Sequence, residues 1–509
     1  MLYKSITISS LLFPIVAFAS DLGADKIIDE KFEKATAWFV NFIFYQIDFG
    51  DDIKVYWVLF PLILGATYFT FYFKFINLTG IKTSINIIRG KYDNVDLNEK
   101  DSKINAGEVS HFQALTAALS ATVGLGNIAG VAIAVSIGGA GATFWMIVAG
   151  LLGMASKFVE CTLGVKYRDI GEDGIVYGGP MYYLTKGLKS CGLEKLGRFL
   201  AILFAVFVVG GSFGGGNMFQ ANQAFQLVEN ITGGSSSILH QKGWLFGLIM
   251  SVFVGVVIIG GIKKIASVTD KIVPFMVVIY VTASLFVIFT NYHLIGNAFK
   301  QILDGAFSPN GVAGGAIGVL IQGFRRAAFS NEAGIGSASI AHSAVKTNYA
   351  ASEGLVALLE PFIDTVIVCT MTALVLIITG YVDSSNSNLT DAGAILMTSS
   401  AFGSVISWFP YILTIAVVLF AFSTMISWSY YGFQGWAYLF GRSKKMEYTY
   451  KIIFCLFVIV GSAASLGSVI EFSDAMIFSM MVPNMIGIII LAPKVKDELQ
   501  KYLSAIKKA

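Results

Sequence analysis

The chain has 509 residues, of which 55% are hydrophobic and only 13% charged, and its mean hydropathy is +0.72. A soluble globular protein is roughly 25% charged, so this composition excludes a water-exposed surface of ordinary extent and predicts an all-α integral membrane protein. The net charge of +3 is too small to indicate a nucleic-acid partner. The four cysteines and four histidines are dispersed without metal-ligand or catalytic spacing, which argues against an enzyme.

At the N-terminus, Lys4 precedes an apolar run from Ile8 to Ala19, which Ser20 and Asp21 follow. This run is shorter than the ~20 residues needed to cross a bilayer. For residues 1–20 we therefore predict a signal peptide, with an N-terminal interfacial helix as the alternative.

About 11 apolar segments long enough to span a membrane follow. They occupy residues 53–77, 110–137, 142–165, 198–228, 243–261, 271–290, 311–334, 354–379, 407–440, 450–466 and 470–492.

The connecting loops alternate in positive charge. Loops 79–109 and 166–197 and the tail 493–509 carry five Lys or Arg each, whereas loops 229–242 and 291–310 carry one each. Lys and Arg mark the cytoplasmic side of a membrane. We therefore expect a cytoplasmic C-terminus and a multi-pass protein of the bacterial inner membrane.

After an extra helix at 53–77, the spans form two groups of five, 110–290 and 311–492. Because five is odd, the two groups cross the membrane in opposite directions, as in an inverted repeat. Each group opens with a segment interrupted by glycine and polar residues, Ser120–Asn127 in the first and Gly315 through Gly323 to Gly334 in the second. Interrupted helices at corresponding positions indicate the midplane binding site of a secondary transporter.

A broken membrane helix exposes backbone groups that can bind a ligand. Amides at a half-helix N-terminus attract a carboxylate, while freed carbonyls and nearby hydroxyls suit a hard cation. The span at 407–440 adds the hydroxyls of Ser423, Thr424 and Ser427, and Trp428 lies one turn beyond Thr424 on the same face. If that face lines a pocket, the indole leaves room for a small side chain only.

Ionisable residues within the spans are costly and usually face the protein interior. Glu360 and Asp364 stand four residues apart, and we expect them to pair with Arg325 or Arg326 in a structural or gating network. A proton relay is the alternative function of these carboxyl groups.

Several motifs resemble the alanine/glycine:cation symporter family, a branch of the transporters with the LeuT-like fold. The resemblance extends from about residue 50 onward. The motifs are Gly107-Glu-Val-Ser-His-Phe-Gln-Ala-Leu, Ala121-Thr-Val-Gly-Leu-Gly-Asn-Ile-Ala-Gly130, Gly139-Ala-Gly-Ala-Thr-Phe-Trp-Met146, Tyr177-Gly-Gly-Pro-Met-Tyr182, Gly216-Asn-Met-Phe-Gln-Ala-Asn222 and Ala328-Phe-Ser-Asn-Glu-Ala-Gly-Ile-Gly-Ser-Ala338. It implies a LeuT-like 5+5 inverted repeat with one extra N-terminal helix.

The resemblance also implies a set of site residues. Those expected around the substrate are Thr122, Gly124, Gly126, Asn127, Gln220, Gly318, Ile321, Phe324, Thr424 and Trp428. Those expected around one Na⁺ are Ser120, Val123, Phe420, Ser423 and Thr424. A second sodium site is not predicted, because the hydroxyl it needs on the sixth core helix is not evident.

The implied function is Na⁺-coupled uptake of alanine, glycine or both by alternating access, with Na⁺ as the co-transported ion and no other cofactor. Symport of another neutral amino acid, or coupling to H⁺, is the alternative. An ion channel is disfavoured because the chain lacks a TVGYG filter and an evident ring of charges. The sequence leaves the oligomeric state open.

Overall fold

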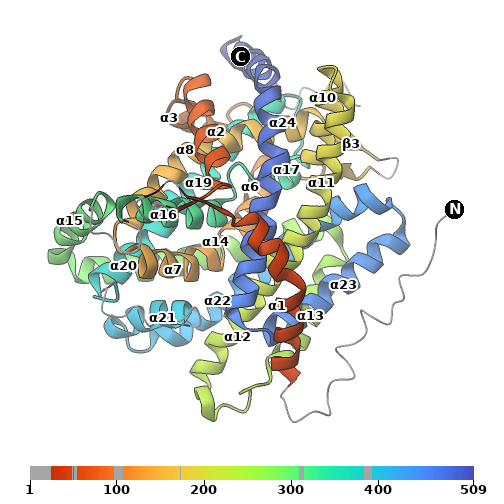
Figure 1. Ribbon diagram of the computed structural model, residues 1–509. Coiled ribbons are helices and arrows are strands. Elements are labelled where there is room, and N and C mark those ends of the chain that lie inside the picture. The colour runs from red at the N-terminus through yellow and green to blue at the C-terminus, as the bar shows by residue number, and fades with distance from the viewer. Residues whose placement is uncertain are drawn as a thin grey trace.

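The computed structural model describes residues 24–48, 50, 54–96, 107–171, 174–308, 315–382 and 393–508, so the predicted signal segment 1–20 lies outside it. The described chain is nearly all helical, as the composition predicts (Figure 1). Two short antiparallel ribbons accompany the helices. They pair β1 (Gln46–Asp48) with β2 (Lys54–Tyr56), and β3 (Asp169–Ile170) with β4 (Val176–Tyr177).

Within the described residues, seven helical stretches are long and apolar enough to cross a membrane. They are α8 (Ala142–Lys166), α11 (Glu194–Phe213) continued by α12 (Phe219–Ile231), α14 (Gly261–Thr290), α18 (Ala350–Ala357) continued through α19 (Leu359–Pro361) to α20 (Thr370–Ile378), α22 (Phe409–Phe440), α23 (Lys444–Ala463) and α24 (Leu466–Lys508).

An eighth span results if α6 (His111–Thr122) and α7 (Ala129–Gly138) are counted as one bent pair. The predicted spans at 53–77, 243–261 and 311–334 coincide with shorter helices. These are α2 (Leu59–Tyr72), α13 (Gly243–Ile258) and α16 (Gly315–Asn331). The all-α membrane fold is thus confirmed, while the count of eleven stays a prediction.

The first half of the first broken helix, α6, begins at a defined cap and ends just before Gly124. Ser110 Oγ accepts a hydrogen bond from the Gln113 amide at 3.2 Å, and Gln113 Oε1 accepts one from the Ser110 amide at 3.1 Å, which fixes the start of α6. After Thr122 the chain leaves the helical conformation, and Gly124 is extended. The axis bends by 56° before α7 continues.

The second break lies only at the C-terminal end of the segment that the sequence predicted to be interrupted, Gly315 through Gly323 to Gly334. Helix α16 runs unbroken through Gly318 and Gly323, and the chain unwinds only between Asn331 and α17 (Ala338–His342). A Cβ on Gly323 would lie 2.6 Å from Trp145 Cβ, so this glycine permits close packing of α16 against α8 and does not interrupt the helix.

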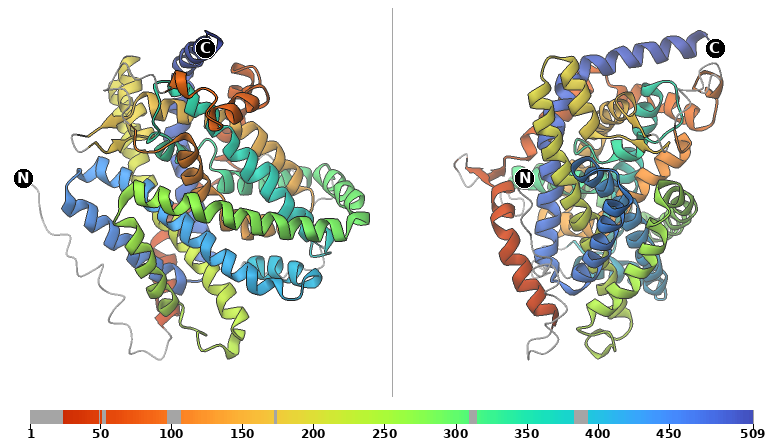
Figure 2. Two further views of the ribbon diagram at one scale, coloured as in Figure 1. Left: turned by 180° about the vertical axis from the view of Figure 1, so that it is seen from behind. Right: turned by 90° about the vertical axis from the view of Figure 1, so that its right-hand side faces the viewer.

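Helix α22 lies inside the bundle, where it packs against α6, α11, α12 and α14. Helix α24 runs alongside α11, and its last turns extend beyond one end of the bundle (Figures 1 and 2). The remaining α-helices are α1 (Ala24–Ile43), α3 (Ile76–Thr79), α4 (Ile81–Ile88), α5 (Asp93–Asp96), α9 (Pro180–Tyr182), α10 (Leu188–Ser190), α15 (Ile295–Ala306) and α21 (Ala394–Val405).

Candidate functional site

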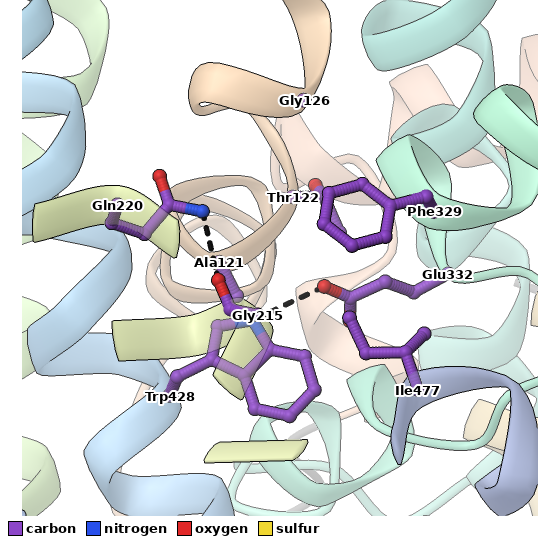
Figure 3. A pocket seen from close by; sticks show the side chains of 9 residues that line it. All are labelled: Ala121, Thr122, Gly126, Gly215, Gln220, Phe329, Glu332, Trp428 and Ile477. Atoms are coloured by element: carbon purple, nitrogen blue, oxygen red, sulfur yellow. Dashed lines mark hydrogen bonds between the residues drawn. The ribbon is translucent and has the colours of Figure 1, made fainter. Parts of the chain in front are cut away.

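A small cavity lies where the two broken helices meet α12, α22 and α24 (Figure 3). Its lining combines backbone at the breaks, two polar side chains, one carboxylate and large apolar groups. The lining residues are Ala121, Thr122, Gly126, Gly215, Gln220, Phe329, Glu332, Trp428 and Ile477.

The indole of Trp428 closes one side of this cavity. Its Nε1 donates a hydrogen bond to Glu332 Oε1 at 3.1 Å, and the side chain is buried (Figure 3). Close packing of the ring requires Gly216, because a Cβ there would lie 2.2 Å from Trp428 Cγ. Gly216 belongs to η5 (Gly214–Met218), a π-helical turn between α11 and α12. This turn brings backbone close to the ring, as π-turns often do at functional sites.

Gln220 lines the cavity from α12 and joins α12 to the first broken helix. Its Nε2 donates to the Gly215 carbonyl at 2.9 Å (Figure 3), and its Oε1 accepts from the Leu125 amide at 3.4 Å. The approach of the two breaks is close at Gly126, where a Cβ would lie 3.4 Å from Ser330 Cα. This distance is an ordinary van der Waals contact, so the two broken helices meet beside the cavity.

A cluster of oxygen atoms lies between the end of α6 and the middle of α22. Thr424 Oγ1 donates to the Ser120 carbonyl at 2.9 Å, and Ser120 Oγ donates to the Ser423 carbonyl at 2.8 Å. Ser427 Oγ donates to Ser120 Oγ at 3.0 Å, and Ser423 Oγ donates to the Phe420 carbonyl at 3.0 Å. Hydroxyl and carbonyl oxygens are the ligands that hard cations prefer. Val123, also a predicted Na⁺ ligand, is buried and caps the C-terminus of α6 three residues after Ser120.

A second polar cluster surrounds the buried carboxylate of Asp364, in the π-helical segment η8 (Phe362–Cys369). Asn127 Nδ2 donates to Asp364 Oδ1 at 2.7 Å, while Ser330 Oγ and Thr365 Oγ1 donate to Oδ2 at 2.8 and 2.7 Å. Among the described residues, no basic side chain forms an ion pair with Asp364. A buried carboxylate with neutral donors alone is costly, so the cluster is suited to a cation.

Sequence reasoning missed Ser330 as the hydroxyl of this second cluster. Because α16 continues to Asn331, Ser330 lies in its last turn and faces η8. The Ser330-Asn-Glu-Ala-Gly334 motif contains this hydroxyl. Its orientation toward Asp364 depends on where α16 ends, which the motif alone does not specify.

Four of the residues predicted around the substrate line the cavity, namely Thr122, Gly126, Gln220 and Trp428. Thr424 lies instead in the oxygen cluster on Ser120.

The first break uses two further predicted residues internally. The amide of Gly124 donates to Asn127 Oδ1 at 2.8 Å, so that amide is occupied within the break itself. The Asn127 side chain faces Asp364 and not the cavity. Both residues thus stabilise the unwound conformation that brings Gly126 to the cavity.

Three of the residues predicted around the substrate belong to α16, and the structure places them outside the lining of the cavity. Gly318, Ile321 and Phe324 lie on earlier turns of α16 and do not line the cavity, and the Phe324 ring packs near Trp145 at a centroid distance of 6.4 Å. Because α16 breaks late, this helix contributes Phe329 to the cavity, and the break that follows contributes Glu332.

The predicted ion pairs are also corrected. Arg325 and Arg326 both bind Asp474 of α24, at 2.8 and 2.5 Å, and neither meets Glu360 or Asp364. Glu360 faces α8 instead, where Lys157 Nζ lies 2.9 Å from its Oε1. The arginines therefore join α16 to α24, whereas Glu360 joins α19 to α8.

A bundle of membrane-spanning helices with a cavity between two broken helices, beside clusters of hydroxyl, carbonyl and carboxylate oxygens, defines a secondary active transporter. The model of the sodium:alanine symporter family matches residues 41–509, and the chain belongs to this family.

Among its relatives, the sodium/alanine symporter AgcS of Methanococcus maripaludis is 40% identical over 406 residues, which cover 80% of this chain and 86% of that one. The probable sodium/glutamine symporter GlnT of Bacillus subtilis is 33% identical, with 90% of each chain covered. The crystal structure of MhsT in complex with L-phenylalanine has a similar fold, with a TM-score of 0.55, 15% identity, and 76% of this chain and 89% of that chain covered.

Proposed function

We propose that the protein carries alanine, glycine or both into the cell together with Na⁺, by alternating access at the cavity. The observation that carries this proposal is the Trp428 indole, held against Glu332 across the cavity, because it leaves room for a small side chain only. Membership of the sodium:alanine symporter family supports the same substrate and ion.

In this proposal the substrate carboxylate binds near Gly126, at the unwound start of α7, where amides and the helix dipole favour negative charge. Thr122 and Gln220 supply hydrogen-bonding groups beside it. The side chain of the amino acid points toward Trp428, Phe329 and Ile477, whose apolar surface accepts a methyl group.

The proposal places Na⁺ at the oxygen cluster of Ser120, Ser423 and Thr424. Its ligands come from α6 and α22, so a bound ion stabilises the arrangement in which these two helices are close together, which is how differential affinity couples ion binding to conformation. The cluster on Asp364 is the proposed second cation position, since a cation there offsets the buried carboxylate. Each charge carried inward yields about 2.3 kcal/mol per 100 mV of membrane potential.

We further propose a bacterial inner membrane location with a cytoplasmic C-terminus. The positively charged segments around α3 and α10 lie at the same end of the bundle as the C-terminus, whereas the end of α12, which leads into a loop with one lysine, lies at the opposite end (Figure 1). The positive-inside rule supports this orientation.

Uptake by proteoliposomes tests the proposal and separates its alternatives. Radiolabelled alanine is expected to accumulate with an inward Na⁺ gradient and not with a pH gradient alone. A competition panel of glycine, alanine, valine and glutamine gives the substrate range. Equal accumulation without Na⁺ contradicts sodium coupling, and stronger competition by glutamine than by alanine contradicts a small-substrate cavity.

A further inference from the structure

We infer that Glu332 determines substrate size by holding Trp428 in place, so that this carboxylate is a specificity-determining residue of the transporter. The inference rests on the proposed function, since it concerns which amino acid the same cavity accepts. It starts from a contact that joins the second break to α22.

The carboxylate of Glu332 is occupied on both oxygens by neutral donors. Oε1 accepts from Trp428 Nε1 at 3.1 Å, and Oε2 accepts from Ser337 Oγ at 2.5 Å. Ser337 lies at the other end of the same break, just before α17. Glu332 therefore ties the indole to both ends of the unwound segment.

The backbone conformation at Glu332 indicates that this position requires the glutamate side chain. Three residues of the break have positive φ, at +55° for Glu332, +85° for Gly334 and +97° for Gly336. Glycine adopts this conformation readily, but a residue with a Cβ does so at a cost. The break uses glycine at two of the three positions and keeps a glutamate at the one whose side chain reaches the cavity.

The other contacts of the buried indole are apolar, and they include Gly211, where a Cβ would lie 3.5 Å from the ring. Gly216 packs against one side of the ring, and Tyr431 contacts it edge to face at a centroid distance of 5.4 Å. Apolar contacts of this kind are not directional. The hydrogen bond to Glu332 is directional, and without it the indole N–H would be a buried donor without its acceptor. The ring would then move to find another partner, which enlarges the cavity.

The test measures selectivity between two amino acids that differ by one methylene. Uptake is measured in proteoliposomes with an inward Na⁺ gradient, for the wild type and for E332M, E332D and E332Q. The selectivity ratio is the inhibition constant of 2-aminobutyrate divided by the KM of alanine. One methylene in a restrictive apolar pocket changes recognition by roughly tenfold or more. We expect a selectivity ratio of at least about ten for the wild type. In E332M and E332D we expect this ratio to be roughly tenfold lower.

The conservative variant separates positioning from general damage. Glutamine keeps an acceptor oxygen for Trp428 Nε1, so E332Q is expected to retain the wild-type ratio within about twofold, even if its transport rate falls. Aspartate tolerates a positive φ but its carboxylate is one methylene shorter, so E332D provides the test if E332M does not fold.

A wild-type ratio in E332M or E332D overturns the inference, as does loss of selectivity in E332Q. If the wild type accumulates another amino acid and not alanine, the proposed substrate is wrong. The same ratio is then measured with that amino acid and its next larger homologue, which keeps the test of Glu332 independent.

Discussion

The side-chain amide of Asn127 donates a hydrogen bond to the carboxylate of Asp364 at 2.7 Å, and thereby joins the first break to η8. Asn127 also accepts from the Gly124 amide at 2.8 Å, so one side chain both shapes the break and contacts the buried acid. If a cation binds at Asp364, its binding and the conformation of the break are linked through Asn127.

Replacing Asp364 by asparagine preserves its shape and removes its charge. A contact to a charged group contributes about 1.5–3 kcal/mol, so D364N is expected to raise the Na⁺ concentration for half-maximal uptake roughly tenfold or more. Titration of alanine uptake against Na⁺ measures this. The control is D169N, which changes a half-exposed carboxylate elsewhere. An unchanged Na⁺ requirement in D364N would remove Asp364 from the cation pathway.

A methyl group on Gly124 should disturb the oxygen cluster of Ser120, Ser423 and Thr424. Its Cβ would lie 2.6 Å from Thr424 Oγ1, which must then move from the Ser120 carbonyl. We expect G124A to raise the Na⁺ concentration for half-maximal uptake roughly tenfold, which corresponds to about 1.4 kcal/mol. G130A is the matched control, because a Cβ there meets nothing within 4 Å. Similar Na⁺ dependence in the two variants would contradict a cation role for Thr424.

The Lys157 and Glu360 pair is predicted to be structural. Both side chains are fully buried, so K157M leaves a buried carboxylate with its principal cation removed, at a cost of about 3–5 kcal/mol. Thermal unfolding in detergent should show a lower Tm for K157M and substantial recovery in the K157M/E360Q double variant. The control K186M, which breaks a half-exposed pair with Asp169, should change stability by about 0–1 kcal/mol. A Tm for K157M equal to that of K186M would argue against this role.

Trp428 itself should limit the size of the substrate. Replacement by leucine removes most of the ring that closes the cavity, so W428L is expected to take up valine and other larger neutral amino acids that the wild type rejects. Competition against labelled alanine measures the change. An unchanged order of competitors would exclude Trp428 from the substrate cavity.

The first break could be read from the sequence because Ser120, Thr122 and Asn127 flank two closely spaced glycines in an otherwise apolar span. Gly318 and Gly323 were misleading, since a glycine that breaks a helix and a glycine that permits packing look alike in sequence. Only the position of Trp145 against Gly323 distinguishes them. Glu332, whose side chain enters the cavity, lies a full turn or more beyond these glycines.

The charged groups were harder to assign than the spans. The partner of Arg325 is Asp474, which lies 149 residues later on α24, and no local pattern connects them. Glu360 and Asp364 share a helical stretch, yet the π-helical geometry of η8 and the packing of α8 give them different partners. Pairing between helices depends on their arrangement in space, which composition and periodicity do not specify.

The measurement that tests the account most directly is the affinity of the purified protein for alanine with and without Na⁺. Titration calorimetry in detergent, with choline replacing Na⁺ at constant ionic strength, gives both values. Because ligands from α6 and α22 enclose the proposed ion beside the substrate cavity, we predict that Na⁺ lowers the Kd of alanine at least about fivefold and that alanine raises Na⁺ affinity by the same factor. The same alanine affinity in choline and in Na⁺ would contradict the coupled mechanism.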